Sequence, residues 1–204
     1  MIAVLVASLA VAGLGGYHLS RDGQQAIPDS LMGTLWPQPR VLGEFALTDH
    51  DGAEFGLRQL RGQWTLVFFG YTSCPDICPS TMLTLRGVSA ALGEMGDAQP
   101  QVVLVSVDPQ RDSADKLGEY VGYFDPEFRG VTGAPEQLYA LALQIGAMYE
   151  LLPADENGNY EVAHSASIFL VDPQARMYAA FSPPLQSDQI AKKLVAIAHY
   201  YEKS

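Results

Sequence analysis

The stretch 64–79 constrains the fold of this chain more than any other segment. It opens with the apolar, β-branched and aromatic run Trp64–Phe69, which is typical of a central strand buried on both faces. Pro79 suits the first position of a helix, where its missing N–H costs nothing, and it disfavours the helical conformation in the residue before it. We therefore predict a strand, a tight turn and a helix, with Cys74 on the turn and Cys78 as the helix cap.

Cys74 and Cys78 are the only two cysteines of the chain, and three residues separate them. A structural disulfide is one interpretation, but it would close a very small loop and stabilise the fold little. A redox-active dithiol is the second, although the usual motif has two intervening residues. The third is a metal site, because thiolates select soft ions such as Cu(I) and Zn²⁺. The position favours chemistry, because ligand sites gather at the carboxyl ends of strands and a helix amino terminus lowers the pKa of a thiol.

The amino-terminal segment is apolar. Residues 1–19 contain no Asp, Glu, Lys or Arg, and their length is near the lower limit for a membrane-spanning helix. A cleavable signal peptide is the alternative, because Ala10–Ala12 resembles a small-residue cleavage site. We expect residues 1–20 to be a membrane anchor or signal segment, residues 21–40 to be a linker, and residues 41–204 to form one globular domain.

The pattern of this domain predicts an α/β fold. Strand-like and helix-like segments alternate along it, and a hairpin and a last helix close it, which is typical of a thioredoxin-like fold with a mixed central sheet flanked by helices. A further hairpin precedes the central strand as an amino-terminal extension, and Asn157–Gly158 predicts another hairpin turn. The predicted strands are 44–48, 64–69, 101–107, 128–132, 167–171 and 177–181, and the predicted helices are 80–95, 113–124, 135–147 and 187–201.

Composition excludes two broad classes of protein. With 48% hydrophobic and 17% charged residues, the chain can bury a substantial core and is not intrinsically disordered. The net charge of −11 argues against a nucleic acid or an anionic membrane surface as the partner. It fits attraction to a basic partner, and it also fits an ordinary solvated acidic surface.

Two further places hold polar residues next to predicted strands. His164 stands directly ahead of the apolar predicted strand 167–171. A lone histidine at a strand entry is usually structural, but in a thioredoxin-like fold the loop before this strand lies against the cysteine turn, which would bring His164 towards the two thiols. Asp108 and Asp112 follow the strand 101–107. For both aspartates we favour turn chemistry over a supporting role beside the cysteines.

Three separated motifs carry a resemblance to a known family. They are Phe69–Pro79 (FGYTSCPDICP), Val105–Asp112 (VSVDPQRD), and His164–Ser165 ahead of a strand that ends in Val171–Pro173. In this order the chain resembles the Sco (SenC) family of copper-binding assembly proteins, over nearly the whole of the globular domain. One departure is Ala163, where the family commonly has an aspartate that would orient the neighbouring imidazole.

The resemblance implies that Cys74, Cys78 and His164 bind one copper ion, as Cu(I) or Cu(II). The same three ligands could hold Zn²⁺ with a water molecule. The implied function is that of a membrane-tethered monomeric copper chaperone for the dinuclear copper centre of cytochrome c oxidase subunit II, or for another copper-assembly protein. Its soluble domain would face the periplasm from the inner (cytoplasmic) membrane or, alternatively, the mitochondrial intermembrane space.

A thiol–disulfide reductase is the alternative function, and it belongs to another class of protein. Cys74 and Cys78 would then be a catalytic redox pair that keeps the copper-ligand cysteines of a partner reduced, and His164 would be dispensable. A peroxiredoxin-like peroxidase is a distant third, favoured only by Thr72 near Cys74. In the chaperone interpretation the protein is not an enzyme.

Overall fold

The computed structural model describes residues 26–203. The predicted anchor or signal segment, residues 1–20, and residues 21–25 of the predicted linker lie outside this range. Among the described residues, no helix has the length and apolar character needed to cross a bilayer. The chain divides into two compact units, one of residues 33–192 and a smaller one that includes residues 26–32 and 193–203. The sheet and the predicted site residues belong to the larger unit.

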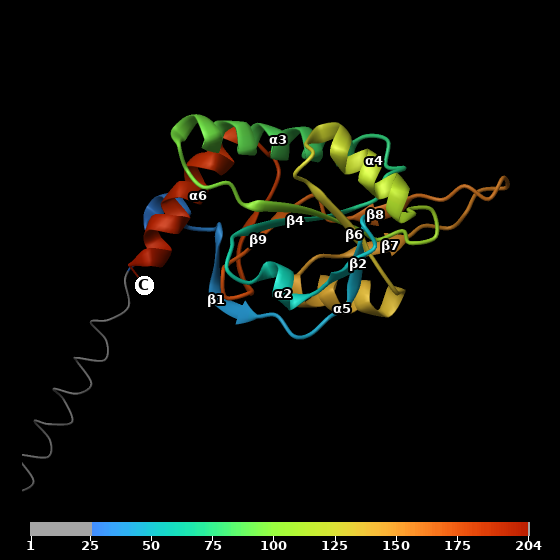
Figure 1. Cartoon of the computed structure of the whole chain (residues 1–204), viewed down its shortest axis with the longest axis horizontal. Helices are drawn as coiled ribbons and strands as arrows, with labels where there is room; N and C mark the ends of the chain where they lie inside the picture. Colours follow the sequence, from blue (N-terminus) through green and yellow to red (C-terminus); the bar gives the residue numbers. More distant parts are fainter. Residues whose placement is uncertain (1–25, 204) are drawn as a thin grey trace, which may run out of the picture. The chain divides into compact units, whose positions relative to one another are not determined.

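The larger unit is organised around a mixed sheet. Within the described residues this sheet has eight strands in the order β1-β10-β9-β4-β5-β6-β2-β3 (Figure 1). β4 (Thr65–Gly70) runs parallel to β5 (Gln101–Ser106) and antiparallel to β9 (Ile168–Val171). The other strands are β1 (Leu35–Val41), β2 (Leu47–Asp49), β3 (Glu54–Phe55), β6 (Arg129–Thr132) and β10 (Arg176–Phe181), and a separate ribbon pairs β7 (Tyr149–Leu151) with β8 (Val162–His164).

Helices cover both faces of the sheet. Figure 1 shows α3 (Ile77–Met95) and α4 (Ala114–Phe124) over one face, and α2 (Leu57–Leu60) and α5 (Pro135–Ile145) over the other. The last helix, α6 (Ser187–Glu202), begins against α3, where the Ser187 hydroxyl donates to the Thr84 carbonyl at 3.0 Å. A short 3₁₀ helix, η1 (Asp29–Leu31), lies in the smaller unit. The predicted thioredoxin-like α/β arrangement is therefore confirmed.

The central strand β4 explains where the site forms. All six of its residues are buried, as a strand between two helical layers requires. Because β4 and β5 are parallel, Gly70 pairs with Ser106, and the segments that follow these two residues leave the sheet side by side at one edge. The turn that carries the cysteines follows β4, and the segment that carries Asp108 and Asp112 follows β5.

The start of α3 differs from the prediction. Asp76 is the N-cap and Ile77 the first helical residue, so Cys78 lies inside the first turn and is not the cap. Pro79 takes the third helical position. A backbone N–H at that position would also lack an acceptor within the helix, and proline is therefore tolerated there.

The remaining differences concern short or irregular elements. β1 pairs antiparallel with β10, which places residues 35–40 of the predicted linker in the sheet, and its two prolines obscure the strand pattern at this edge position. The predicted hairpin extension is confirmed as β2 and β3, although β2 begins at Leu47 rather than at Glu44. The turn at Asn157–Gly158 lies in the segment that joins β7 to β8, and these two strands are too short to give a periodic pattern.

Candidate metal centre

The two cysteines approach each other from the turn after β4 and the first turn of α3. The Cys74 backbone N–H donates to the Tyr71 carbonyl at 3.2 Å, which closes the turn. Cys74 is partly exposed, whereas Cys78 is fully buried, and both are free thiols. Burial raises the pKa of Cys78 well above its ordinary value, and a hydrogen bond from the Tyr71 backbone acts in the opposite direction. The expectation that the helix terminus favours the thiolate is therefore wrong for Cys78, because desolvation dominates.

Gly70 makes room for the buried thiol. A Cβ atom added at Gly70 would lie 2.7 Å from Cys78 Sγ and 3.0 Å from a ring carbon of Phe68. Real side chains do not tolerate the shorter of these distances. The glycine that ends β4 is therefore required by the close packing of Cys78 against the strand.

Gly70→Ala is expected to displace the Cys78 side chain and to destabilise the fold by about 1–3 kcal/mol through overpacking. Metal affinity should fall with it, because Sγ moves away from the other donors. The matched control is Gly122→Ala in α4, where an added Cβ meets no atom within 4 Å. That change should leave metal binding intact and stabilise the helix by up to about 1 kcal/mol. Chemical unfolding and metal titration of both variants test the pair, and equal behaviour of the two would contradict the packing argument.

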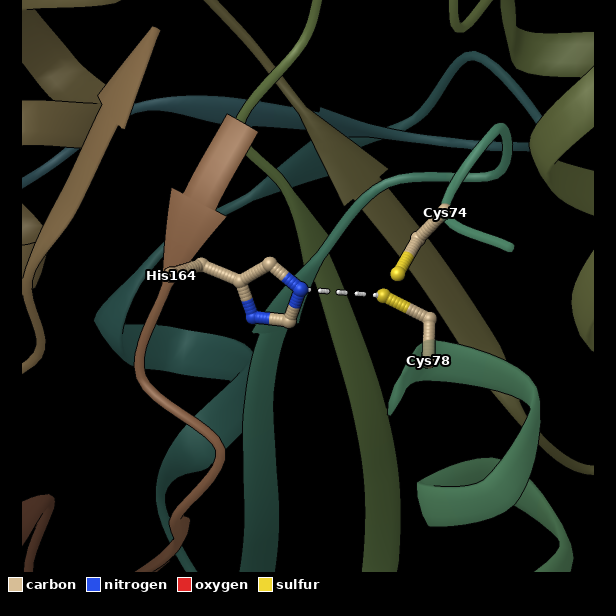
Figure 2. A group of neighbouring side chains, drawn as sticks. All are labelled: Cys74, Cys78 and His164. Carbon is tan, nitrogen blue, oxygen red and sulfur yellow. Dashed lines mark hydrogen bonds between the residues drawn. The ribbon is translucent and has the colours of Figure 1, made fainter. Parts of the chain in front are cut away.

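His164 completes the cluster from the end of β8. Its Nε2 atom lies 3.3 Å from Cys78 Sγ (Figure 2). The ring is held edge-on by Phe68 and Tyr71, with centroid separations of 5.7 Å and 5.9 Å. Nδ1 lies 3.2 Å from the Ser165 carbonyl, to which it donates when Nε2 keeps its lone pair for the thiols. Burial lowers the pKa of His164, which favours this neutral form.

With alanine rather than aspartate at position 163, the hydrogen-bond partner of the His164 ring is the Ser165 carbonyl. An imidazole that ligates a metal needs an acceptor for its other N–H, which fixes both the ring orientation and the tautomer. In this chain a backbone carbonyl of the next residue provides that acceptor at 3.2 Å. Ala163 itself is exposed on β8. The missing aspartate therefore does not leave the ring of His164 without an orienting partner.

The three donor atoms form a compact set. Cys74 Sγ, Cys78 Sγ and one ring nitrogen of His164 all lie within 4.8 Å of one another. Two thiolates and an imidazole suit Cu(I), Cu(II) or Zn²⁺. The partly exposed Cys74 leaves one side of the set open to an approaching ligand. The cluster can thus hold a soft metal ion, or alternatively pass electrons through the two thiols.

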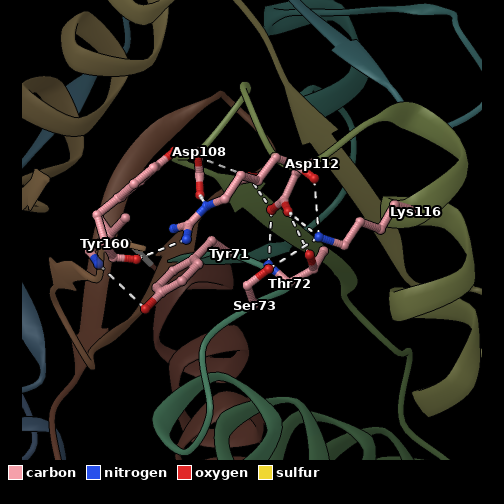
Figure 3. Close-up of polar contacts among 10 residues, drawn as sticks. Tyr71, Thr72, Ser73, Asp108, Asp112, Lys116 and Tyr160 are labelled. Carbon is pink, nitrogen blue, oxygen red and sulfur yellow. Dashed lines mark hydrogen bonds and ion pairs between the residues drawn. The ribbon is translucent and has the colours of Figure 1, made fainter. Parts of the chain in front are cut away.

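Asp112 ties the cysteine turn to β5 and α4. It is 1% exposed and accepts hydrogen bonds from the Thr72 backbone N–H at 2.9 Å and the Thr72 hydroxyl at 2.5 Å. The Ser106 hydroxyl donates to it at 2.6 Å, and Lys116 Nζ lies 3.5 Å away (Figure 3). Thr72 is two residues from Cys74, so this carboxylate fixes the position of the turn.

Asp108 supports the other side of the centre. It pairs with Arg111 and accepts from the Tyr160 hydroxyl at 2.7 Å. The Arg111 guanidinium lies 3.6 Å from the Tyr160 ring centroid and 5.4 Å from that of Tyr71. Tyr71 in turn receives the Val162 backbone N–H at 3.4 Å on its hydroxyl. This chain of contacts joins the segment after β5 to the ribbon that carries His164.

The preference for plain turn chemistry at Asp108 and Asp112 is therefore incomplete. Both do shape the local turn, because the backbone N–H groups of Arg111 and Asp112 donate to the Asp108 carbonyl. Their side chains, however, are buried and hold the two segments that carry the site. The feature that indicates this supporting role is the position of the two aspartates after a strand parallel to β4, at the same edge of the sheet as the cysteine turn.

Comparison with known proteins places this chain in a family. The SCO1/SenC family model matches residues 34–199. The mitochondrial SCO2 homolog of Bos taurus is 35% identical over 194 residues, which cover 92% of this chain and 71% of the bovine protein. The crystal structure of Arabidopsis thaliana ScoI with copper bound has a TM-score of 0.74 at 30% identity, covering 79% of this chain and 99% of that one. BsSco, described as a member of the Sco family of cytochrome c oxidase assembly proteins, shares the fold at a TM-score of 0.63 and 21% identity, covering 84% of this chain and 96% of that one.

A thioredoxin-like domain with two thiols and one imidazole converging at a sheet edge defines a class of proteins that bind soft metals or exchange thiols. The matched residues narrow the assignment, because they include both cysteines and the histidine of this centre. The chain belongs to the SCO1/SenC family. The resemblance drawn from its three motifs is confirmed.

Proposed function

We propose that this protein is a copper chaperone for cytochrome c oxidase assembly that carries one copper ion on Cys74, Cys78 and His164. The observation that carries the proposal is the convergence of these three donors within 4.8 Å, from segments far apart in the sequence. The copper-bound ScoI structure at 30% identity supports copper as the ion. The donor set itself suits Cu(I) in trigonal coordination and accommodates Cu(II).

The asymmetry of the two thiols supports delivery of the ion. Cys78 is buried and stays with the protein, whereas Cys74 is partly exposed. A thiolate of the recipient can therefore enter beside Cys74 and replace the ligands one at a time. We propose the dinuclear copper centre of cytochrome c oxidase subunit II as the destination, and we expect the chaperone to act as a monomer.

We further propose that residues 1–20 tether the protein to the inner (cytoplasmic) membrane with the soluble domain in the periplasm. The apolar sequence of this segment supports the proposal. The alternative is the mitochondrial inner membrane, facing the intermembrane space, and the bovine SCO2 homolog is a mitochondrial protein. Fractionation of cells that express the full chain, with and without residues 1–20, distinguishes a tethered protein from a released one.

His164→Ala is expected to weaken Cu(II) binding most and to change the thiolate-to-copper absorption band, while Cys74 and Cys78 keep their redox activity. The reason is that Nε2 of His164 lies beside Cys78 Sγ and is the only nitrogen donor of the set. Copper titration of the reduced full-length protein, followed by absorption and paramagnetic resonance, measures the effect.

The matched control is His199→Ala, since this histidine lies on α6 with its side chain 71% exposed. It should bind one copper ion with the native spectrum. If copper stoichiometry and spectrum survive in His164→Ala as they do in the control, the three-residue site is wrong.

A thiol–disulfide reductase is the second candidate, and the contact between the two thiols favours it. Cys74, the exposed thiol, would attack a partner disulfide, and Cys78 would then displace the partner from the mixed disulfide. The products are a Cys74–Cys78 disulfide and two reduced thiols on the partner. Indifference to copper, together with rapid reduction of a partner disulfide by both native protein and His164→Ala, would favour this function over copper delivery.

A further inference from the structure

A groove lies directly beside His164. It has a volume of about 540 Å³ and is formed by α5, the segment that follows it, and the β7–β8 ribbon. Its walls include Tyr139 and Leu143 of α5, Met148, and His164 itself. Tyr139 is 58% exposed, Leu143 57% and Met148 77%. Large apolar side chains gathered in one exposed hollow mark a binding surface more often than scattered ones do.

The segment that forms the groove carries charge of one sign. Residues 131–175 contain no lysine or arginine. Asp172 is buried and paired with Arg176, so it contributes little to the surface. The exposed acidic residues of this segment are Glu136, Glu150, Asp155, Glu156 and Glu161, and Glu150 also lines the groove. The apolar hollow is therefore built from an acidic segment, and Arg40 of β1, which donates to the Gln144 carbonyl at 3.2 Å, is a cation from another element beside it.

We propose that this groove docks the copper recipient through a segment that has an apolar or aromatic side chain flanked by lysine or arginine. The proposal rests on the proposed function and deepens it by naming the surface and the chemistry of the partner. The groove shares His164 with the metal centre. A segment seated against Leu143 and Met148 therefore lies next to the ion that is to be transferred.

Charge decides between a basic partner and a second copy of this chain. The chain has a net charge of −11, and the segment that forms the groove is acidic in every copy. Pairing two such surfaces would oppose like charges, which disfavours self-association. A basic segment gains from the same field, because complementary charge speeds association and fixes the orientation of docking.

The test measures binding of copper-loaded full-length protein to the copper-free soluble domain of subunit II from the same organism. Leu143→Ser should raise the Kd about tenfold, as expected for loss of an apolar anchor at an interface. Glu150→Lys should lower the association rate and weaken its dependence on salt. The matched controls lie outside the groove: Tyr123→Ser, at a side chain that is 80% exposed on α4, and Glu127→Lys, at an exposed glutamate after α4.

Copper stoichiometry and spectrum should be native in all four variants, which separates docking from metal binding. If Leu143→Ser and Glu150→Lys bind the recipient as the controls do, the groove is not its docking site, whether or not copper is transferred. Native protein that binds the recipient through the groove but passes on no copper overturns the proposed delivery and leaves the docking site standing. A native dimer in sedimentation that Leu143→Ser dissociates would assign the groove to a second copy and overturn the proposal.

Discussion

Cys78→Ser is expected to abolish tight copper binding. Cys78 contributes a buried sulfur that lies 3.3 Å from His164 Nε2, and a serine hydroxyl is a poor ligand for Cu(I). The loss should exceed the roughly 10–100-fold that removing an outer hydrogen-bond partner of a metal ligand costs. Competition with a Cu(I) chelator measures it, and thermal unfolding verifies that the nearly isosteric serine leaves the fold intact. Retention of native affinity would remove Cys78 from the site.

The pH dependence of copper affinity is a second test of Cys78 as a copper ligand. Burial raises the pKa of Cys78 above the ordinary thiol value, so the group is protonated near neutral pH in the metal-free protein. Copper must displace this proton. The Cys78 thiol alone should therefore raise the copper affinity about tenfold per pH unit between about pH 6.5 and 8. His164 does not oppose this trend, because burial lowers its pKa and favours the neutral imidazole. In the weak binding that Cys78→Ser retains, the contribution of Cys78 to the slope should be absent, and an unchanged slope would contradict its role.

The central part of the fold is predictable because its signals are local. The continuous apolar run of β4 must be covered on both faces, and the cysteine turn follows from the glycine and prolines around it. Short elements give no such signal. The β7–β8 ribbon has three residues in each strand, and β1 contains two prolines, so tertiary pairing rather than sequence pattern defines them.

The site was predictable only in part, for a different reason. His164 meets Cys78 across 86 residues, and no periodicity reveals such a contact. The expected fold and the resemblance of the motifs are what point to His164. The sequence does not reveal the role of Asp112, since the spacing Asp108–Asp112 describes a turn equally well. Only the parallel pairing of β4 with β5 brings its carboxylate to Thr72. Local chemistry thus locates the thiols, whereas their supports depend on topology.

Asp112→Ala is expected to destabilise the protein by roughly 3 kcal/mol and to weaken copper binding. The change leaves the Thr72 backbone N–H and the Ser106 hydroxyl without their acceptor in a buried site, and each unsatisfied group costs about 1–3 kcal/mol. The ion pair with Lys116 adds little, because the lysine side chain is 43% exposed. In a domain of this size the midpoint of thermal unfolding should fall by about 6–12 °C.

The copper measurement separates an anchor of the cysteine turn from a merely structural residue. Without Asp112 the turn is free to move at Thr72, two residues from Cys74, so copper affinity should fall roughly 10–100-fold even well below the unfolding temperature. Asp112→Asn keeps one carbonyl acceptor and should lie between the native protein and Asp112→Ala in both measurements. Asp97→Ala, at an exposed aspartate just after α3, controls for the loss of a carboxylate and should change neither. If Asp112→Ala loses stability but binds copper as tightly as Asp97→Ala, the carboxylate supports the fold alone, and the position of Cys74 is set by the metal itself.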